Sequence, residues 1–71
     1  MNQSDVTRLQ SYLQTTFGND GIKLVPRGKP TDSAEMMLNG EFLGVVYRDE
    51  DEGDISFDLH MSILEMDLPK L

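Results

Sequence analysis

The residues of this chain that could do chemistry lie in one acidic run. Asp49-Glu50-Asp51-Glu52-Gly53-Asp54 places five carboxylates within six positions, and carboxylate oxygens are ligands that calcium prefers. An EF-hand calcium loop that began at Asp49 would need a ligand at position 5 and a glutamate at position 12, but Gly53 and His60 occupy those positions. The spacing therefore excludes an EF-hand. A weak divalent-cation site remains as an alternative, with three candidate ligands: Asp49, Asp51 and Asp54.

His60 is the only histidine of the chain. Acid–base catalysis would need an orienting carboxylate within reach, and Asp58 lies two residues away, about 7 Å along a strand. An open sheet face also has no pocket that would exclude water. The chain has no cysteine, and hence no disulfide or thiolate metal site. We therefore expect a protein that is not an enzyme, with no catalytic residues and no cofactor.

The charge of the chain limits its partners. The formal net charge is −7 and the pI is about 4.3, which disfavours binding to the phosphates of nucleic acids or of anionic membranes. No apolar run approaches the roughly 18 residues of a membrane span, and the first residues lack the basic and apolar regions of a signal peptide. We expect a cytoplasmic protein with neither nucleic-acid nor membrane partners.

The elements that position these residues begin with a helix over Ser4–Phe17. Ser4 is a suitable N-cap and Gly18 a suitable residue to end the helix. Its apolar stripe would face the core, and its polar side chains would face solvent. The stripe comprises Val6, Leu9, Leu13 and Phe17; the polar set comprises Arg8, Gln10, Ser11 and Gln14.

Four strands are expected after the helix. Ile22–Val25 and Ser33–Leu38 are separated by a proline- and glycine-containing loop at 26–32, and the segment 41–63 divides into two strands around the acidic run. Asn39-Gly40 is the strongest short hairpin signal. The fold class is α+β, an N-terminal helix packed on one face of a four-stranded antiparallel meander, in one small domain over 1–71. Residues 62–68 continue as a bulged strand or form a short helix.

Strand alternation predicts a register for the last hairpin. Ile55, Phe57, Leu59, Met61 and Ile63 alternate with polar residues. If Arg48 lies opposite Asp54, an apolar residue of one strand meets an apolar residue of the other at each inward position, whereas a one-residue slip exchanges the faces. This register leaves a tip of three or five residues. The inward pairs would be Tyr47 with Ile55, Val45 with Phe57 and Leu43 with Leu59.

The face of the sheet that the helix does not cover is the candidate interaction surface. The same alternation directs Met37, Phe42, Val46 and His60 outward. A contiguous apolar patch beside polar groups is typical of a binding or dimer surface, and a 71-residue chain has a small core of its own. We expect a homodimer that acts through protein–protein interaction. The alternatives are a divalent-cation or small-ligand module that uses the acidic tip, or an acidic mimic that binds a basic partner.

Two segments carry a family resemblance. Thr16-Phe17-Gly18-Asn19 through Ile22-Lys23-Leu24-Val25-Pro26-Arg27, together with Tyr47–Asp54, resemble a family of short bacterial proteins known only as a domain of unknown function. The resemblance covers nearly the whole chain. It implies a small, stand-alone bacterial cytoplasmic protein, and it carries over no activity, cofactor or site residue.

Overall fold

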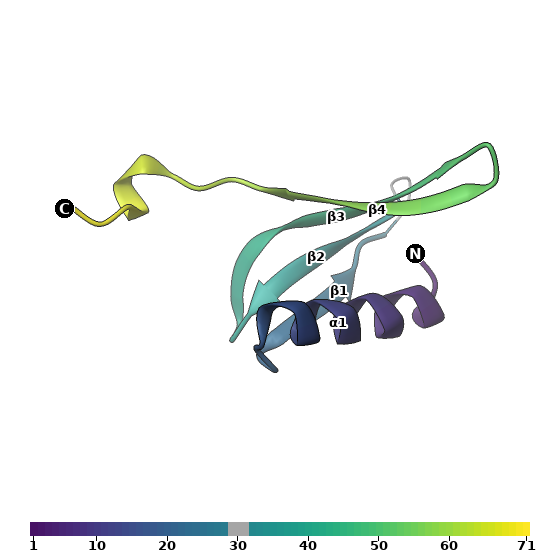
Figure 1. The fold of residues 1–71 in the computed structure, drawn as a ribbon, viewed down its shortest axis with the longest axis horizontal. Helices are drawn as coiled ribbons and strands as arrows, with labels where there is room; N and C mark the ends of the chain where they lie inside the picture. The colour runs from purple at the N-terminus through teal and green to yellow at the C-terminus, as the bar shows by residue number, and fades with distance from the viewer. Residues whose placement is uncertain (29–31) are drawn as a thin grey trace.

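A single antiparallel sheet and one helix make up the computed structural model of the chain, which describes residues 1–28 and 32–71 (Figure 1). The strands lie in the order β1-β2-β3-β4, which confirms the predicted α+β meander. Part of the loop predicted at 26–32 lies outside the described residues. The elements are α1 (Gln3–Phe17), β1 (Ile22–Pro26), β2 (Ser33–Leu38), β3 (Glu41–Asp51), β4 (Asp54–Met61) and the single 3₁₀ turn η1 (Glu65–Asp67).

Local side-chain chemistry sets both ends of α1. The side chain of Asn2 accepts a hydrogen bond of 2.7 Å from the backbone N–H of Asp5, so Asn2 is the N-cap and the prediction of Ser4 was wrong. Gly18 ends the helix in the left-handed conformation, with φ of 63°, and its N–H is directed at the carbonyls of Gln14 and Thr15. The predicted C-terminal end of the helix is therefore confirmed.

The core lies between α1 and the first three strands. The helix packs on β1, and in Figure 1 it lies beneath β1 and β2. Phe17, expected in the core stripe, is instead exposed at the end of the helix. The buried apolar side chains are Val6, Leu13, Ile22, Leu24, Ala34, Met36 and Val46.

A β-bulge between β2 and β3 changes which face each later residue of β3 occupies. Met37 pairs with Phe42, as regular pairing from the Asn39-Gly40 turn requires, but Met36 pairs with Gly44 and not with Leu43. Leu43 is thus an extra residue, and it shifts the alternation of β3 by one position. Gly44 permits a close approach of the strands, because a Cβ there would lie 2.3 Å from the carbonyl oxygen of His60.

The β3–β4 hairpin also differs from the predicted register. Asp51 pairs with Asp54 across a two-residue turn, and Arg48 pairs with Phe57 rather than with Asp54. Both turn residues have positive φ, 51° at Glu52 and 84° at Gly53, which is the geometry of a type I′ turn. The predicted tip of three or five residues was therefore too long. The observed register pairs Val46 with Leu59 on the helix side of the sheet.

The chain leaves the sheet after Met61. Residues 62–64 form neither strand nor helix, and η1 has no side-chain cap. The predicted bulged strand over 62–68 was therefore wrong. The short helix that was the alternative is reduced to one 3₁₀ turn. In Figure 1 this C-terminal segment extends away from the body, at the end opposite to the acidic tip.

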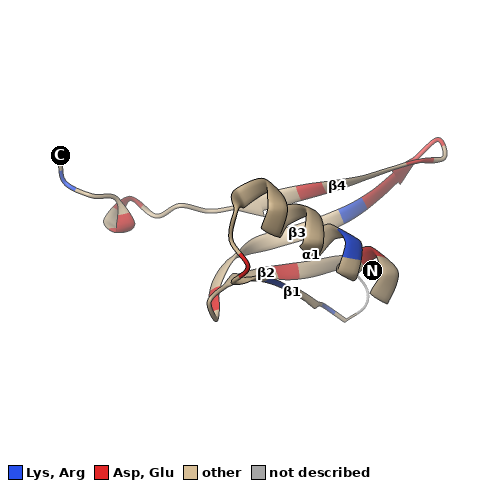
Figure 2. Cartoon of the chain, turned by 60° about the horizontal axis from the view of Figure 1, so that its bottom comes forward, with Lys and Arg blue, Asp and Glu red and all other residues tan. Residues whose placement is uncertain are grey.

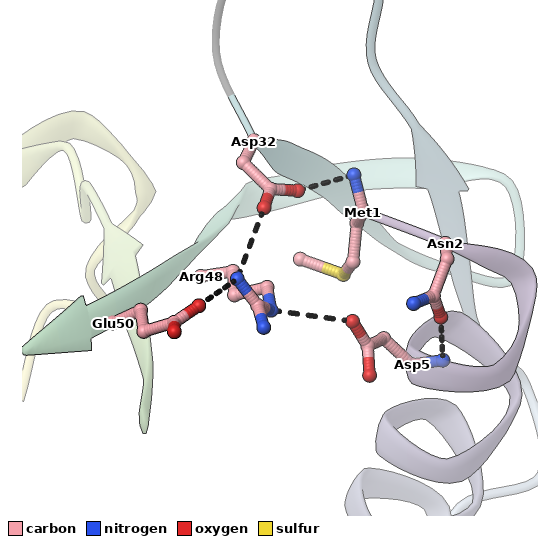
Figure 3. Close-up of polar contacts among 6 residues, drawn as sticks. All are labelled: Met1, Asn2, Asp5, Asp32, Arg48 and Glu50. Carbon is pink, nitrogen blue, oxygen red and sulfur yellow. Dashed lines mark hydrogen bonds and ion pairs between the residues drawn. The ribbon is translucent and has the colours of Figure 1, made fainter. Parts of the chain in front are cut away.

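Arg48 joins the start of α1 to β3 (Figure 3). Its buried Nε lies 3.4 Å from Asp5 Oδ2, and its Nη1 lies 3.2 Å from Glu50 Oε1 and 3.7 Å from Asp32 Oδ2. Asp32 also forms an ion pair with the amino group of Met1. Because of the bulge, Arg48 points to the helix side of the sheet, as Val46 does two residues earlier. Figure 2 shows a basic band on β3 behind the acidic tip.

Candidate protein-binding surface

The structure brings together three of the four residues predicted for the outer interaction surface. Phe42 is 55% exposed and is the cross-strand partner of half-buried Met37. His60 is exposed and pairs with Val45. Val46 does not belong to this surface: it is 2% exposed and lies in the core. The extra residue at the bulge turned Val46 inward and placed Val45 and Tyr47 on the outer face.

The outer face carries a hollow with a volume of about 440 Å³. The rings of Tyr47 and His60 meet edge to face in its wall, with their centroids 5.1 Å apart and an interplanar angle of 72°. Strands β3 and β4 supply most of the wall, and the C-terminal segment closes one end. The lining residues are Phe42, Leu43, Gly44, Val45, Tyr47, His60, Ser62, Leu64 and Asp67.

The lining of this hollow combines aromatic and aliphatic side chains with polar ones, among them Ser62 and Asp67. His60 can donate or accept a hydrogen bond there. The imidazole of His60 is exposed to solvent. Aromatic residues in such surfaces are frequent anchors of protein interfaces.

The acidic tip holds the three carboxylates named as a weak cation site. Asp51 lies opposite Asp54, while Asp49 lies opposite Ser56, and all are exposed. In the ranges 1–28 and 32–71, no group of three or more histidine, cysteine, aspartate or glutamate side chains could hold a metal ion. In Figure 2 the tip is an acidic projection from the body.

Sequence reasoning missed a second apolar surface, on the helix side of β4. Ile55, Leu59 and Met61 point to the face that carries α1, but they are 53%, 38% and 48% exposed. The helix lies over β1 and leaves this end of the sheet open. A groove of about 210 Å³ lies there, lined by Phe17, Asn19, Ile22, Met36, Leu38, Leu43, Leu59 and Met61.

The position of α1 follows from two glutamines that were predicted to face solvent. Gln10 Oε1 accepts a hydrogen bond of 2.9 Å from the backbone N–H of Leu24, and Gln14 Nε2 donates one of 2.8 Å to the carbonyl of Ile22. Both backbone groups belong to β1, the first edge of the sheet. The spacing of four residues on one helix face was the only sequence signal for this contact.

The other edge of the sheet, β4, has β3 on one side only. In an antiparallel pair, every second residue turns its N–H and C=O away from the neighbouring strand. All residues of β4 except Phe57 are exposed. This edge therefore offers backbone donors and acceptors beside exposed apolar side chains.

The family model for a protein of unknown function, DUF3126, matches residues 5–67. The chain belongs to the DUF3126 family. This match confirms the resemblance to a family of unknown function, while the bacterial origin stays a prediction. Neither the curated proteins nor the solved structures gave a match. The DUF3126 match includes both edges of the sheet and η1, so the surfaces described above lie within the family's domain. Among the described residues, no helix is long and apolar enough to cross a membrane.

Proposed function

We propose that this DUF3126 protein is a non-enzymatic interaction module that self-associates and binds a protein partner through the outer face of its sheet. The observation that supports the proposal most strongly is the incomplete cover of that sheet. One helix covers the end near β1, and apolar side chains stay exposed on both faces of the β3–β4 hairpin. The exposed apolar side chain on the outer face is Phe42, and the exposed apolar side chains on the helix side include Leu59 and Met61.

The size of the exposed surface supports association. The chain exposes 5541 Å², whereas a compact monomer of 8.0 kDa exposes about 4,450 Å². The excess of about 1,100 Å² exceeds the roughly 800 Å² that each partner buries in a standard interface. The radius of gyration of 13.4 Å likewise exceeds the roughly 11 Å of a compact 71-residue domain.

The direct test of self-association is the mass of the purified protein in solution. Sedimentation equilibrium from low to high micromolar concentration should give a mass that rises from 8.0 kDa to twice that value. A mass that stays at the monomer value throughout this range would contradict the proposal.

The outer face can be tested separately with two matched variants. Phe42→Asp places a charge beside the hollow, while Phe17→Asp makes the same change at a residue of similar exposure, 57%, at the end of α1. Circular dichroism checks that both variants fold. Capture of partners from an extract of the source cells should be lost with F42D and kept with F17D. Equal capture by the two variants would remove the outer face from the proposal.

A further inference from the structure

The exposed edge strand reads almost the same from either end. Around Leu59, each residue on one side has a chemical counterpart at the same distance on the other. Ile55 corresponds to Ile63, Ser56 to Ser62, Phe57 to Met61 and Asp58 to His60. An antiparallel pair of identical strands places each residue opposite its counterpart across a two-fold axis. A strand with this symmetry is therefore complementary to itself.

We infer, on the basis of the self-association proposed above, that two copies pair antiparallel along β4 with the two-fold axis at Leu59. The two four-stranded sheets then form one continuous sheet across the axis. The second copy is the occupant of this edge, and the β3 part of the outer hollow, with Phe42, Val45 and Tyr47, stays free for a different protein. In this register, Leu59 faces the partner's Leu59, and Asp58 faces the partner's His60.

Neighbouring registers are less favourable. Two residues that lie directly opposite each other point to the same face of the sheet. Each symmetric register is therefore centred on one residue, and the two registers nearest to Leu59 are centred on Asp58 and on His60. One step toward the tip places Asp58 opposite the partner's Asp58, and like charges directly opposite are destabilising. One step the other way places His60 opposite the partner's His60 and Asp58 opposite the partner's Ser62. Only the register centred on Leu59 places the Asp58 carboxylate of each copy opposite the His60 imidazole of the other.

The side chains of this register suit both faces of the joined sheet. Ile55, Phe57 and Leu59 lie on the helix side, where they are exposed or half-buried, and each would face an apolar residue of the second copy. The outer face would carry two Asp58–His60 pairs, in which a carboxylate oxygen accepts a hydrogen bond from an imidazole N–H. Residues 62 and 63, which leave the strand in the single chain, would extend β4 by pairing with the partner's Ser56 and Ile55.

The strong acidic charge of the chain does not oppose this arrangement. Gly53 at the tip is six residues from Leu59, about 20 Å along the strand. Because the strands are antiparallel, the two acidic tips lie at opposite ends, about 40 Å apart. The Debye length at 0.1 M salt is about 10 Å, so their repulsion is screened.

A charge test uses the pair on the outer face. His60→Asp places a second carboxylate opposite the partner's Asp58 at two symmetric positions, and we expect the dimer dissociation constant to rise by about tenfold or more. The exchange D58H/H60D restores both pairs with unchanged composition, and it should recover the wild-type dissociation constant. Thr7→Glu adds the same charge to an exposed position of α1 and should leave the dimer unchanged. A dimer that tolerates H60D, or that the exchange does not restore, would overturn the assigned register.

A disulfide test reads the register without relying on charge. The chain has no cysteine, so Leu59→Cys introduces a single thiol in each copy. In the proposed register, the Cα atoms of the two substituted residues would lie about 4.5–5.5 Å apart across the axis. This separation is within the range for a disulfide. Met61→Cys is the matched control on the same face, and its copy would be four residues along the strand, about 14 Å away. Mild oxidation should link L59C into covalent dimers and leave M61C unlinked.

The outcomes separate the two proposals. Links through M61C but not through L59C would overturn the register. A wild-type dimer in which L59C does not link and H60D has no effect would overturn the β4 interface but leave self-association in place. A wild-type protein that is monomeric at high micromolar concentration would contradict both proposals.

Discussion

The two edge strands of this sheet, β1 and β4, differ in what covers their backbone. At β1, the side chains of Gln10 and Gln14 bond to the backbone of Leu24 and Ile22, so the helix closes the edge as a neighbouring strand would. At β4, the outer edge carries no neighbouring strand, and the sequence around Leu59 is symmetric. Open edges are sites where a further strand can pair. One edge is therefore covered and the other is open, and in the dimer proposed above the addition of strands would stop at two copies.

The largest predicted effect comes from opening the closed edge. The double substitution Q10A/Q14A leaves the N–H of Leu24 and the carbonyl of Ile22 without these partners, in part-buried positions. An unsatisfied buried polar group costs about 1–3 kcal/mol, so we expect the free energy of unfolding to fall by about 2–4 kcal/mol in urea titrations. Gln3→Ala, at an exposed glutamine of the same helix, should change it by less than about 0.5 kcal/mol.

The same variant also tests the comparison between the edges. With both edges open, each chain can pair on two sides, and growth by successive edge pairing has no natural end. Light scattering should then detect species larger than a dimer for Q10A/Q14A, and only dimers for Q3A. A double variant that keeps wild-type stability and wild-type mass would show that the glutamines do not close the edge.

A smaller effect on stability is expected from a substitution in β3 at the point where this strand lies closest to β4. Gly44→Ala would place a Cβ 2.3 Å from the carbonyl oxygen of His60 and 3.1 Å from Met61 Cα, so β3 and β4 must separate. Overpacking of this kind costs about 1–3 kcal/mol, and it would also bend β4 near the symmetric segment. Thermal unfolding should show the loss, and sedimentation should show weaker association. Gly28→Ala, with no atom within 4 Å of the added Cβ, should show neither effect.

The smallest effect is expected at the acidic tip. Glu52 has φ of 51°, a conformation that asparagine adopts more readily than glutamate. Glu52→Asn should therefore raise the free energy of unfolding by about 0.5–1 kcal/mol. Because the tip is about 20 Å from Leu59, the dimer dissociation constant should not change. Asp49→Asn removes the same charge at an exposed position, so a gain in stability of equal size there would assign the effect to charge instead.

Local signals in the sequence were sufficient for the helix and the four strands, but not for the strand registers or for the segment after Met61. Asn39-Gly40, Gly18 and the alternation after Asp54 predicted the turn between β2 and β3, the end of the helix and the last strand. In β3, however, apolar residues occur at both odd and even positions, so alternation alone allows either set to face the helix. The bulge at Leu43 decides between them, and the isolated Gly44 was the one sequence feature that indicated it.

The same bulge explains which site residues could be predicted. Phe42 precedes the extra residue and Met37 is its partner, so both lie on the expected face. His60 keeps the alternation of its own strand. Val46 follows the bulge and was therefore assigned to the wrong face. The role of Gln10 and Gln14 could not be predicted, because a polar helix face that bonds to a strand edge has the same composition as one that faces water.

Hydrogen exchange at two protein concentrations tests the difference between the two edges most directly. In a dimer paired along β4, the outward amides of this strand become hydrogen-bonded, so exchange over residues 55–63 should slow as the concentration rises through the dissociation constant. The amide of Leu24, already bonded to Gln10, should exchange at the same rate at both concentrations. Protection that rises with concentration at β1 would contradict the account. Protection that rises at the outer hollow while β4 shows none would contradict it as well.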